Sequence, residues 1–376
     1  MKVQKICTEN GERFILLNDC YEPVDHVNRF LKFCDTTGKS PNTLRSYAFH
    51  LKSYYEFMQS RGYSVLDLCA NADHGPVEIL SDFMVYLQYP DYSSKVIDFQ
   101  GFPPAHSDSS INIIIGTVLS FYQFLSQNNE IAELDLYKRQ LANPRFKSFL
   151  SELISNKPQL QRSIFKKKVP EKNIKYITRV QFNDLFFACN SRRDRLLVSI
   201  LFEGGLRINE ALGIHLQDID QLEDGILKIV PRENNENGAR VKNYAAGHIL
   251  LPPYVVDMML NYINTDILDY SSDFLFLNLR GSSRGTPMRS NTAEGLFGRL
   301  SQQLGYKVTP HMLRHGFATE KLEAGWQMED ISAYLRHKNI QSTQIYAHYS
   351  DSLKREKMRT YLDRTNIGYG GVALHG

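Results

Sequence analysis

The 376-residue sequence predicts a mainly α-helical fold with a small antiparallel β-sheet, divided between two domains. Three observations support this prediction. The chain is longer than the length that one hydrophobic core usually serves. Apolar residues recur at helical spacing through most of its long segments. Only short runs, chiefly at 224–233 and 247–252, have the composition of paired strands.

Composition indicates an ordinary soluble globular protein, with a net charge of only +3. A nucleic-acid partner must therefore be inferred from local patches. The 5 cysteines are odd in number and form no C-x-x-C pair, which favours a reducing cytosolic compartment. The N-terminus lacks the apolar core of a signal peptide, and the most apolar run, at 111–125, is too short to span a bilayer. We therefore expect a cytoplasmic protein with no membrane partner.

The first part of the chain predicts a small helical domain at 36–155, preceded by an N-terminal arm or accessory segment at 1–35. A short hairpin is expected around the turn at 9–11. In "SPNTLRSYAFHLKSYYEFM", Ser40 can cap a helix and Pro41 can occupy its first position. Further helical patterns follow at about 75–89 and 108–128.

Residues 156–177 predict a basic linker between the domains. The stretch is rich in lysine and arginine, holds one acidic residue, Glu171, and is interrupted by two prolines. Most charge runs are simply solvated, and composition alone favours that interpretation. The alternative is a strap that neutralises nucleic-acid phosphates, with Lys166, Lys167 and Lys168 as the candidate contacts.

The second domain, at 178–376, begins with a capping-box spacing between Thr178 and Gln181. Two helices separated by Gly204 and Gly205 should follow. The two strands come next, joined by the long polar tip "NNENGARVKNYAAG". Helical patterns then return from 253 to the end of the chain.

Residues 311–350 combine 4 histidines with 2 arginines and 3 tyrosines. A metal site is disfavoured, because Arg314 and Arg336 stand among the histidines and would oppose a cation. Phosphate suits the cluster better, since a guanidinium donates to two phosphate oxygens and imidazole can donate or transfer a proton. A tyrosine nearby can attack phosphorus.

The order of motifs carries a resemblance. "GGLRINEAL", a lysine in a β-hairpin, "HMLRHGFAT", "LRHKNI" and "TQIYAHY" follow one another as in the tyrosine recombinase (phage integrase) family. "SPNTLRSYAFHLKSYYEF" is similar to that family's helical core-binding domain. The resemblance implies a SAM-like core-binding domain and a mixed α/β catalytic domain, which form a C-shaped clamp on DNA. It favours an integrase or transposase of a mobile element.

The resemblance also implies roles for the matching residues. Arg207 and Arg314 would bind the scissile phosphate and stabilise charge on its oxygens. His311 would assist proton transfer with the tyrosine, and His337 would hydrogen-bond the phosphate. Glu210, three residues after Arg207, would have an orienting role.

Two further residues would make and break the covalent bond. Tyr346 would form a 3′-phosphotyrosyl ester, and Lys242 would protonate the departing 5′ oxygen. Chemistry alone does not decide whether Tyr346 or Tyr349 is the nucleophile, and the family spacing selects Tyr346. Arg240 is the basic rival of Lys242. Because one phosphoester replaces another, the reaction requires neither ATP, nor a metal, nor another cofactor.

Arg336 stands where the family commonly has glycine, so it would shift the backbone or add a phosphate contact. The candidate DNA contacts are therefore Arg45, Lys166, Lys167, Lys168 and Arg336. The implied partners are double-stranded recombination sites, a homotetramer on paired sites, and further recombinase subunits encoded by the element. The implied compartment is the bacterial cytoplasm and nucleoid.

Four functional hypotheses remain at this stage. The first is a site-specific recombinase that integrates, excises or transposes a mobile element. A type IB topoisomerase would share its chemistry, although the compact catalytic region disfavours it. A catalytically silent DNA-binding accessory protein of the same fold is the alternative from another class, and it would be expected to lack a catalytic residue. A histidine-rich metalloprotein is the fourth.

Overall fold

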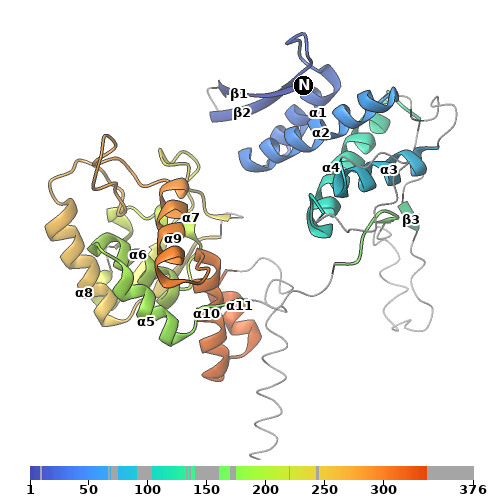
Figure 1. The fold of residues 1–376 in the computed structure, drawn as a ribbon. Coiled ribbons are helices and arrows are strands. Elements are labelled where there is room, and N and C mark those ends of the chain that lie inside the picture. Colours follow the sequence, from blue (N-terminus) through green and yellow to red (C-terminus); the bar gives the residue numbers. More distant parts are fainter. Residues whose placement is uncertain are drawn as a thin grey trace, which may run out of the picture. The chain divides into compact units, whose positions relative to one another are not determined.

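The computed structural model describes residues 1–8, 11–66, 68, 75–90, 104–132, 134, 137–139, 161–169, 175–219, 221–242 and 245–336. The chain divides into two compact units, Met1–Glu171 and Lys172–Gly376. The expected fold class is confirmed: helices dominate, and the described sheets are two-stranded and antiparallel (Figure 1). The boundary between the units falls inside the predicted linker. The expected helix at 143–155 and the C-terminal tail lie outside the described residues.

The N-terminal segment belongs to the core of the first unit. Strand β1 (Lys2–Thr8) pairs with β2 (Gly11–Leu17), and helix α1 (Asp25–Thr36) follows. Leu16, Val27 and Phe30 are buried in one cluster with residues of the next helices. The predicted N-terminal arm or accessory segment at 1–35 therefore contributes buried residues to the core of this unit.

Helix α2 (Pro41–Arg61) begins as predicted, since the Ser40 side chain accepts a hydrogen bond from the Thr43 amide and Pro41 takes the first position. It packs with α3 (Pro76–Gln88) and α4 (Asp108–Gln127). The hydroxyls of Tyr54 and Tyr122 meet at 2.7 Å inside this core. A further two-stranded sheet joins β3 (Tyr137–Arg139) to β4 (Gln161–Ser163).

Within the described ranges, α4 alone is long and apolar enough to cross a membrane by length and composition. Half of that apolar stretch is buried inside the protein. Its buried residues belong to the core of the first unit, among them Ile111, Val118 and Phe121. This is the pattern of a core helix.

The second unit is organised around the buried helix α6 (Arg192–Glu203). Helix α5 (Arg179–Ala188) begins with the predicted capping box of Thr178 and Gln181. Short helix α7 (Ile208–Leu212) is followed by two 3₁₀ turns, η4 (Leu216–Ile219) and η5 (Leu222–Asp224). Strands β5 (Ile226–Ile229) and β6 (Gly247–Leu250) are shorter than expected and pair with Ile226 opposite Leu250.

The remaining helices complete this unit. Helix α8 (Pro253–Tyr262) continues into a π-helical turn, η7 (Ile263–Ile267), and α9 (Ser290–Leu304) follows. Helix α10 (Pro310–Glu323) packs on α6, and α11 (Met328–Tyr334) packs on α10. Gly316 permits the close approach of α10, because a Cβ there would lie 2.3 Å from the carbonyl oxygen of Ile177 and 2.7 Å from the Phe202 ring.

Candidate active site

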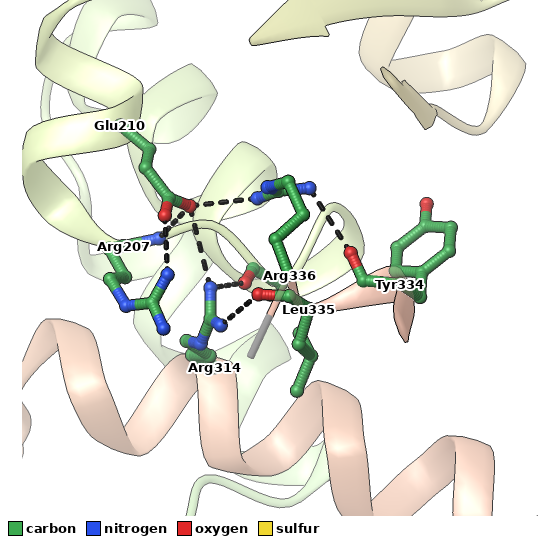
Figure 2. Close-up of polar contacts among 7 residues, drawn as sticks. Arg207, Glu210, Arg314, Tyr334, Leu335 and Arg336 are labelled. Carbon is green, nitrogen blue, oxygen red and sulfur yellow. Dashed lines mark hydrogen bonds and ion pairs between the residues drawn. The ribbon is translucent and has the colours of Figure 1, made fainter. Parts of the chain in front are cut away.

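Glu210 lies at the centre of the candidate site, with a fully buried carboxylate (Figure 2). Arg207 precedes helix α7 in an extended conformation, and Glu210 stands three residues later in the first turn. Glu210 Oε2 accepts a hydrogen bond from the Arg207 backbone at 3.0 Å, and Oε1 accepts one from Arg207 Nη1 at 2.6 Å. The cap of this short helix therefore also orients the Arg207 guanidinium.

Arg314 reaches the same carboxylate from helix α10 and is only 4% exposed. Its Nη1 lies 3.4 Å from Glu210 Oε2 and donates to the Gly205 carbonyl at 2.7 Å. Its Nη2 donates to the Leu335 carbonyl at 2.6 Å. Arg314 thus joins α10 to the turn before α7 and to the end of α11. Gly205, at φ +60°, lets that turn pack directly on Phe317 and Leu335.

Arg336 is the third guanidinium on Glu210, at 2.8 Å from Oε2 (Figure 2). Its side chain is only 7% exposed and also donates to the Tyr334 carbonyl at 3.1 Å. Its φ of +54° is the left-handed conformation that glycine adopts easily. The side chain lies against Gly247, where a Cβ would come within 2.8 Å of Arg336 Cδ. This predicted DNA contact is therefore held inside the protein by Glu210.

The cluster carries excess positive charge. Burial would raise the pKa of Glu210, but Arg336, Arg314 and Arg207 outweigh it and hold that pKa below its ordinary value. Three guanidiniums against one carboxylate leave an excess of two positive charges. Arg336 Nε is also buried without an acceptor among the described residues. Because buried charge without a counter-ion is costly, such a cluster favours binding of an anion.

His311 lies within electrostatic reach of Arg207, Arg314 and Lys242. His311 stands in the first turn of α10, which is capped by Thr309. Desolvation, followed by the positive charges of Arg314, Arg207 and Lys242, lowers the pKa of His311. The imidazole is therefore neutral at pH 7 and able to accept a proton. Lys242 is exposed, in the long connection between β5 and β6.

The two remaining candidate catalytic residues, His337 and Tyr346, lie outside the described residues. Tyr334, the first of the three tyrosines in the 311–350 stretch, has a packing role. Its ring stacks on Phe317 with centroids 5.2 Å apart, and its hydroxyl accepts a hydrogen bond from the Leu250 amide at 3.1 Å. The hydroxyl thus caps the backbone of β6.

The candidate DNA contacts of the first unit differ in exposure. Arg45 is exposed on α2, over the Phe49 ring. Lys166 and Lys168 are exposed.

Lys167, in contrast, is held by the first unit. Its Nζ lies 2.7 Å from Gln88 Oε1 and 3.3 Å from the Asp108 carboxylate. The Asn112 side chain donates to the Lys167 carbonyl at 3.0 Å and accepts from its amide at 2.9 Å. This part of the predicted linker is therefore fastened to α4.

Comparisons with known proteins agree with this geometry. The sequence model of the phage integrase family matches residues 172–352. Transposase A from transposon Tn554 of Staphylococcus aureus is 33% identical over 371 residues, which cover 97% of this chain and 99% of that protein. Tyrosine recombinase XerA of Thermococcus kodakarensis is 26% identical, over 86% of this chain and 91% of that protein.

Two solved structures share the fold. The integrase of transposon Tn1549, in complex with transposon right end DNA, has a TM-score of 0.57 at 17% identity and covers 89% of this chain and 99% of its own. The recombinase XerH, bound to a palindromic difH substrate, has a TM-score of 0.57 at 17% identity, over 89% and 84% respectively. With a relative that is 33% identical along nearly its whole length, this chain belongs to the phage integrase family and is a site-specific DNA recombinase of the tyrosine type.

Proposed function

We propose that this recombinase cuts and rejoins double-stranded DNA at the ends of a mobile element, during its integration, excision or transposition. The observation that carries the proposal is the meeting of Arg207 and Arg314 on Glu210, with His311 in electrostatic reach of both arginines and of Lys242. The full-length similarity to the Tn554 transposase supports the mobile-element context. The enzyme would act in the bacterial cytoplasm, as a homotetramer on paired sites and with any further recombinase subunits of the element.

In the first step, the Tyr346 hydroxyl attacks the scissile phosphorus, and neutral His311 accepts its proton. A bond forms between the tyrosine oxygen and phosphorus, and the bond from phosphorus to the 5′ oxygen breaks. Lys242 gives a proton to that oxygen, which leaves as a hydroxyl. Arg207 and Arg314 neutralise the charge on the non-bridging oxygens, and His337 adds a hydrogen bond.

In the second step, a 5′ hydroxyl of the partner strand attacks the 3′-phosphotyrosyl ester and releases Tyr346. The proton transfers run in reverse, so each residue returns to its starting state. One phosphoester replaces another in each step, and the excess positive charge of the cluster suits the phosphate in both. The roles of His337 and Tyr346 in this scheme are assigned from their positions in the sequence motifs.

A nicked suicide duplex that carries an end of the element tests the proposal. Wild-type protein, without added metal, should form a covalent complex that survives a denaturing gel. Tyr346→Phe should form none, and the matched variant Tyr349→Phe should form it normally. If only Tyr349→Phe loses the complex, the nucleophile is wrong. If wild-type protein binds the duplex but forms no complex, the accessory-protein alternative replaces the enzyme.

A further inference from the structure

The segment 230–242, between β5 and the candidate general acid Lys242, is not a free hairpin tip. Its last six residues alternate in burial: Asn237, Ala239 and Val241 are buried, whereas Arg240 and Lys242 are exposed. The segment turns at 236–237 and passes through Gly238 at φ +73° before it reaches Arg240. Its buried residues hold it on the protein, and the Arg240 and Lys242 side chains are left exposed.

Asn237 attaches the segment to the helix that carries the arginine site. It is 8% exposed, and its Nδ2 donates to the Leu212 carbonyl at 2.8 Å and to the Met288 carbonyl at 3.0 Å. Its Oδ1 accepts a hydrogen bond from the Ala239 amide at 2.9 Å. Leu212 is the last residue of α7, and Arg207 caps the beginning of this helix. The amide group of Asn237 thus links the chain that carries Lys242 to the end of α7 and to Met288, two residues before α9.

A second side chain fixes the same point of the segment. Asn235 donates to the Ala239 carbonyl at 2.9 Å, and its oxygen lies 3.1 Å from His215 Nε2. The backbone of Ala239 is therefore held at its amide by Asn237 and at its carbonyl by Asn235. Upstream, Arg232 pairs with Asp218 at 2.6 and 2.8 Å. Only two residues, Arg240 and Val241, separate the Ala239 anchor from Lys242.

We propose that Asn237 is a positioning residue, which sets the Lys242 ammonium relative to the Arg207 site by tying the segment to the end of α7. This inference rests on the proposed function, in which Lys242 protonates the departing 5′ oxygen. Without the Asn237 amide, the carbonyls of Leu212 and Met288 lose their donor, and the chain before Lys242 loses its attachment to α7. The arginine pair keeps its own contacts with Glu210, so phosphate binding stays intact.

A substrate whose leaving group needs no proton distinguishes misplacement of the Lys242 ammonium from a general loss of activity in the variant. Single-turnover formation of the covalent complex is measured on two duplexes, with either oxygen or sulfur at the 5′ bridging position of the scissile phosphate. A thiolate leaves without protonation, so the sulfur duplex bypasses the general acid. Asn237→Ala should slow cleavage of the oxygen duplex about 100-fold, as misplacement of a catalytic group does. On the sulfur duplex, it should match wild-type protein.

Three controls set the scale of the experiment. Lys242→Ala should show the same rescue by sulfur, and Arg207→Ala should be slow on both duplexes. Asn234→Ala, which changes an exposed asparagine of the same segment, should behave as wild type on both. Asn237→Ser keeps an oxygen that can accept from the Ala239 amide but cannot reach both carbonyls. If Asn237→Ala fails to fold, Asn237→Ser takes its place, and it should be slow on the oxygen duplex and match wild type on the sulfur duplex.

The outcomes separate the two proposals. Rescue of Lys242→Ala without rescue of either Asn237 variant would overturn the positioning role and leave the proposed function in place. Wild-type rates for both Asn237 variants on the oxygen duplex would overturn the positioning role as well. If Lys242→Ala shows no rescue, Lys242 is not the general acid and the role assigned to Asn237 falls with it. If the sulfur duplex rescues Arg240→Ala and not Lys242→Ala, Arg240 is the general acid.

Discussion

A single carboxylate, that of Glu210, is what holds the arginines of this site in place. Three guanidiniums approach its two oxygens, and the Arg207 amide also donates to one of them. Among the described residues, Glu210 is the acidic partner that all three guanidiniums share, so the arrangement of Arg207 and Arg314 depends on it. An enzyme that must bind a phosphate at this point benefits from an incomplete neutralisation, because the remaining positive charge is available to the substrate.

Replacement of this carboxylate should destabilise the second unit. Glu210→Gln leaves three largely buried guanidiniums without a counter-charge, and we expect a loss of about 3 kcal/mol in the free energy of unfolding. The measurement is urea unfolding followed by tryptophan fluorescence. Trp326 is the only tryptophan of the chain and lies beside Tyr334 in this unit, with ring centroids 5.8 Å apart.

Arg336→Gly is the matched control for that variant. It removes one positive charge while Glu210 keeps Arg207 and Arg314, and glycine adopts a φ of +54° without strain. We expect a change within about 1 kcal/mol of wild type. A loss as large as that of Glu210→Gln would contradict the view that Arg207 and Arg314 suffice to neutralise the carboxylate.

At the scale of elements, the site depends on how closely α10 packs on α6. Helix α10 carries His311 and Arg314, and at Gly316 it lies directly against the Ile177 carbonyl and the Phe202 ring. Since a Cβ at Gly316 would overlap the Ile177 carbonyl oxygen and the Phe202 ring, any side chain would push the helix outward.

Gly316→Ala should therefore destabilise the protein by about 1–3 kcal/mol, although alanine has the higher helix propensity. Gly298 in α9 is the matched control, because nothing lies within 4 Å of a Cβ there. Gly298→Ala should stabilise by about 0.5–1 kcal/mol through propensity alone. Urea unfolding measures both variants. Equal effects at the two positions would show that the contact of α10 with Ile177 is not close.

At the scale of the whole molecule, the basic segment at 164–169 belongs to the first unit. Asn112 holds the backbone of this segment on α4, which leaves Lys166 and Lys168 exposed and turns Lys167 toward Asp108. The choice between a solvated linker and a DNA-facing strap therefore has to be made for each lysine separately.

The salt dependence of DNA affinity should separate these lysines. Lys166→Ala and Lys168→Ala should each lower the slope of log K against log salt by about 1, because each would remove one phosphate contact. Lys167→Ala should leave the slope unchanged, since its ammonium already pairs with Asp108. Titration of duplex DNA at several salt concentrations measures the slopes. A drop for Lys167→Ala equal to the others would mean that DNA displaces Asp108.

Several elements and most of the candidate site were predictable from local sequence. Ser40 with Pro41, and Thr178 with Gln181, identified helix starts because caps depend on neighbours within one turn. The motif order pointed to Arg207 and Arg314 far apart in the chain, and the structure brings them to one carboxylate. The place of residues 1–35 was not predictable, because burial of Leu16 and Phe30 depends on helices that come later in the chain.

The sequence alone therefore determined the fold class and the family, because these follow from periodicity and from motif order, and it proposed the residues that carry phosphate chemistry. Only the tertiary structure decided what each side chain does. It placed Arg336 on Glu210, fixed Lys167 on Asp108 and anchored the segment before Lys242 through Asn237. The physical reason is that a charged or amide group takes whichever partner the packed chain brings within reach, and those partners are distant in sequence.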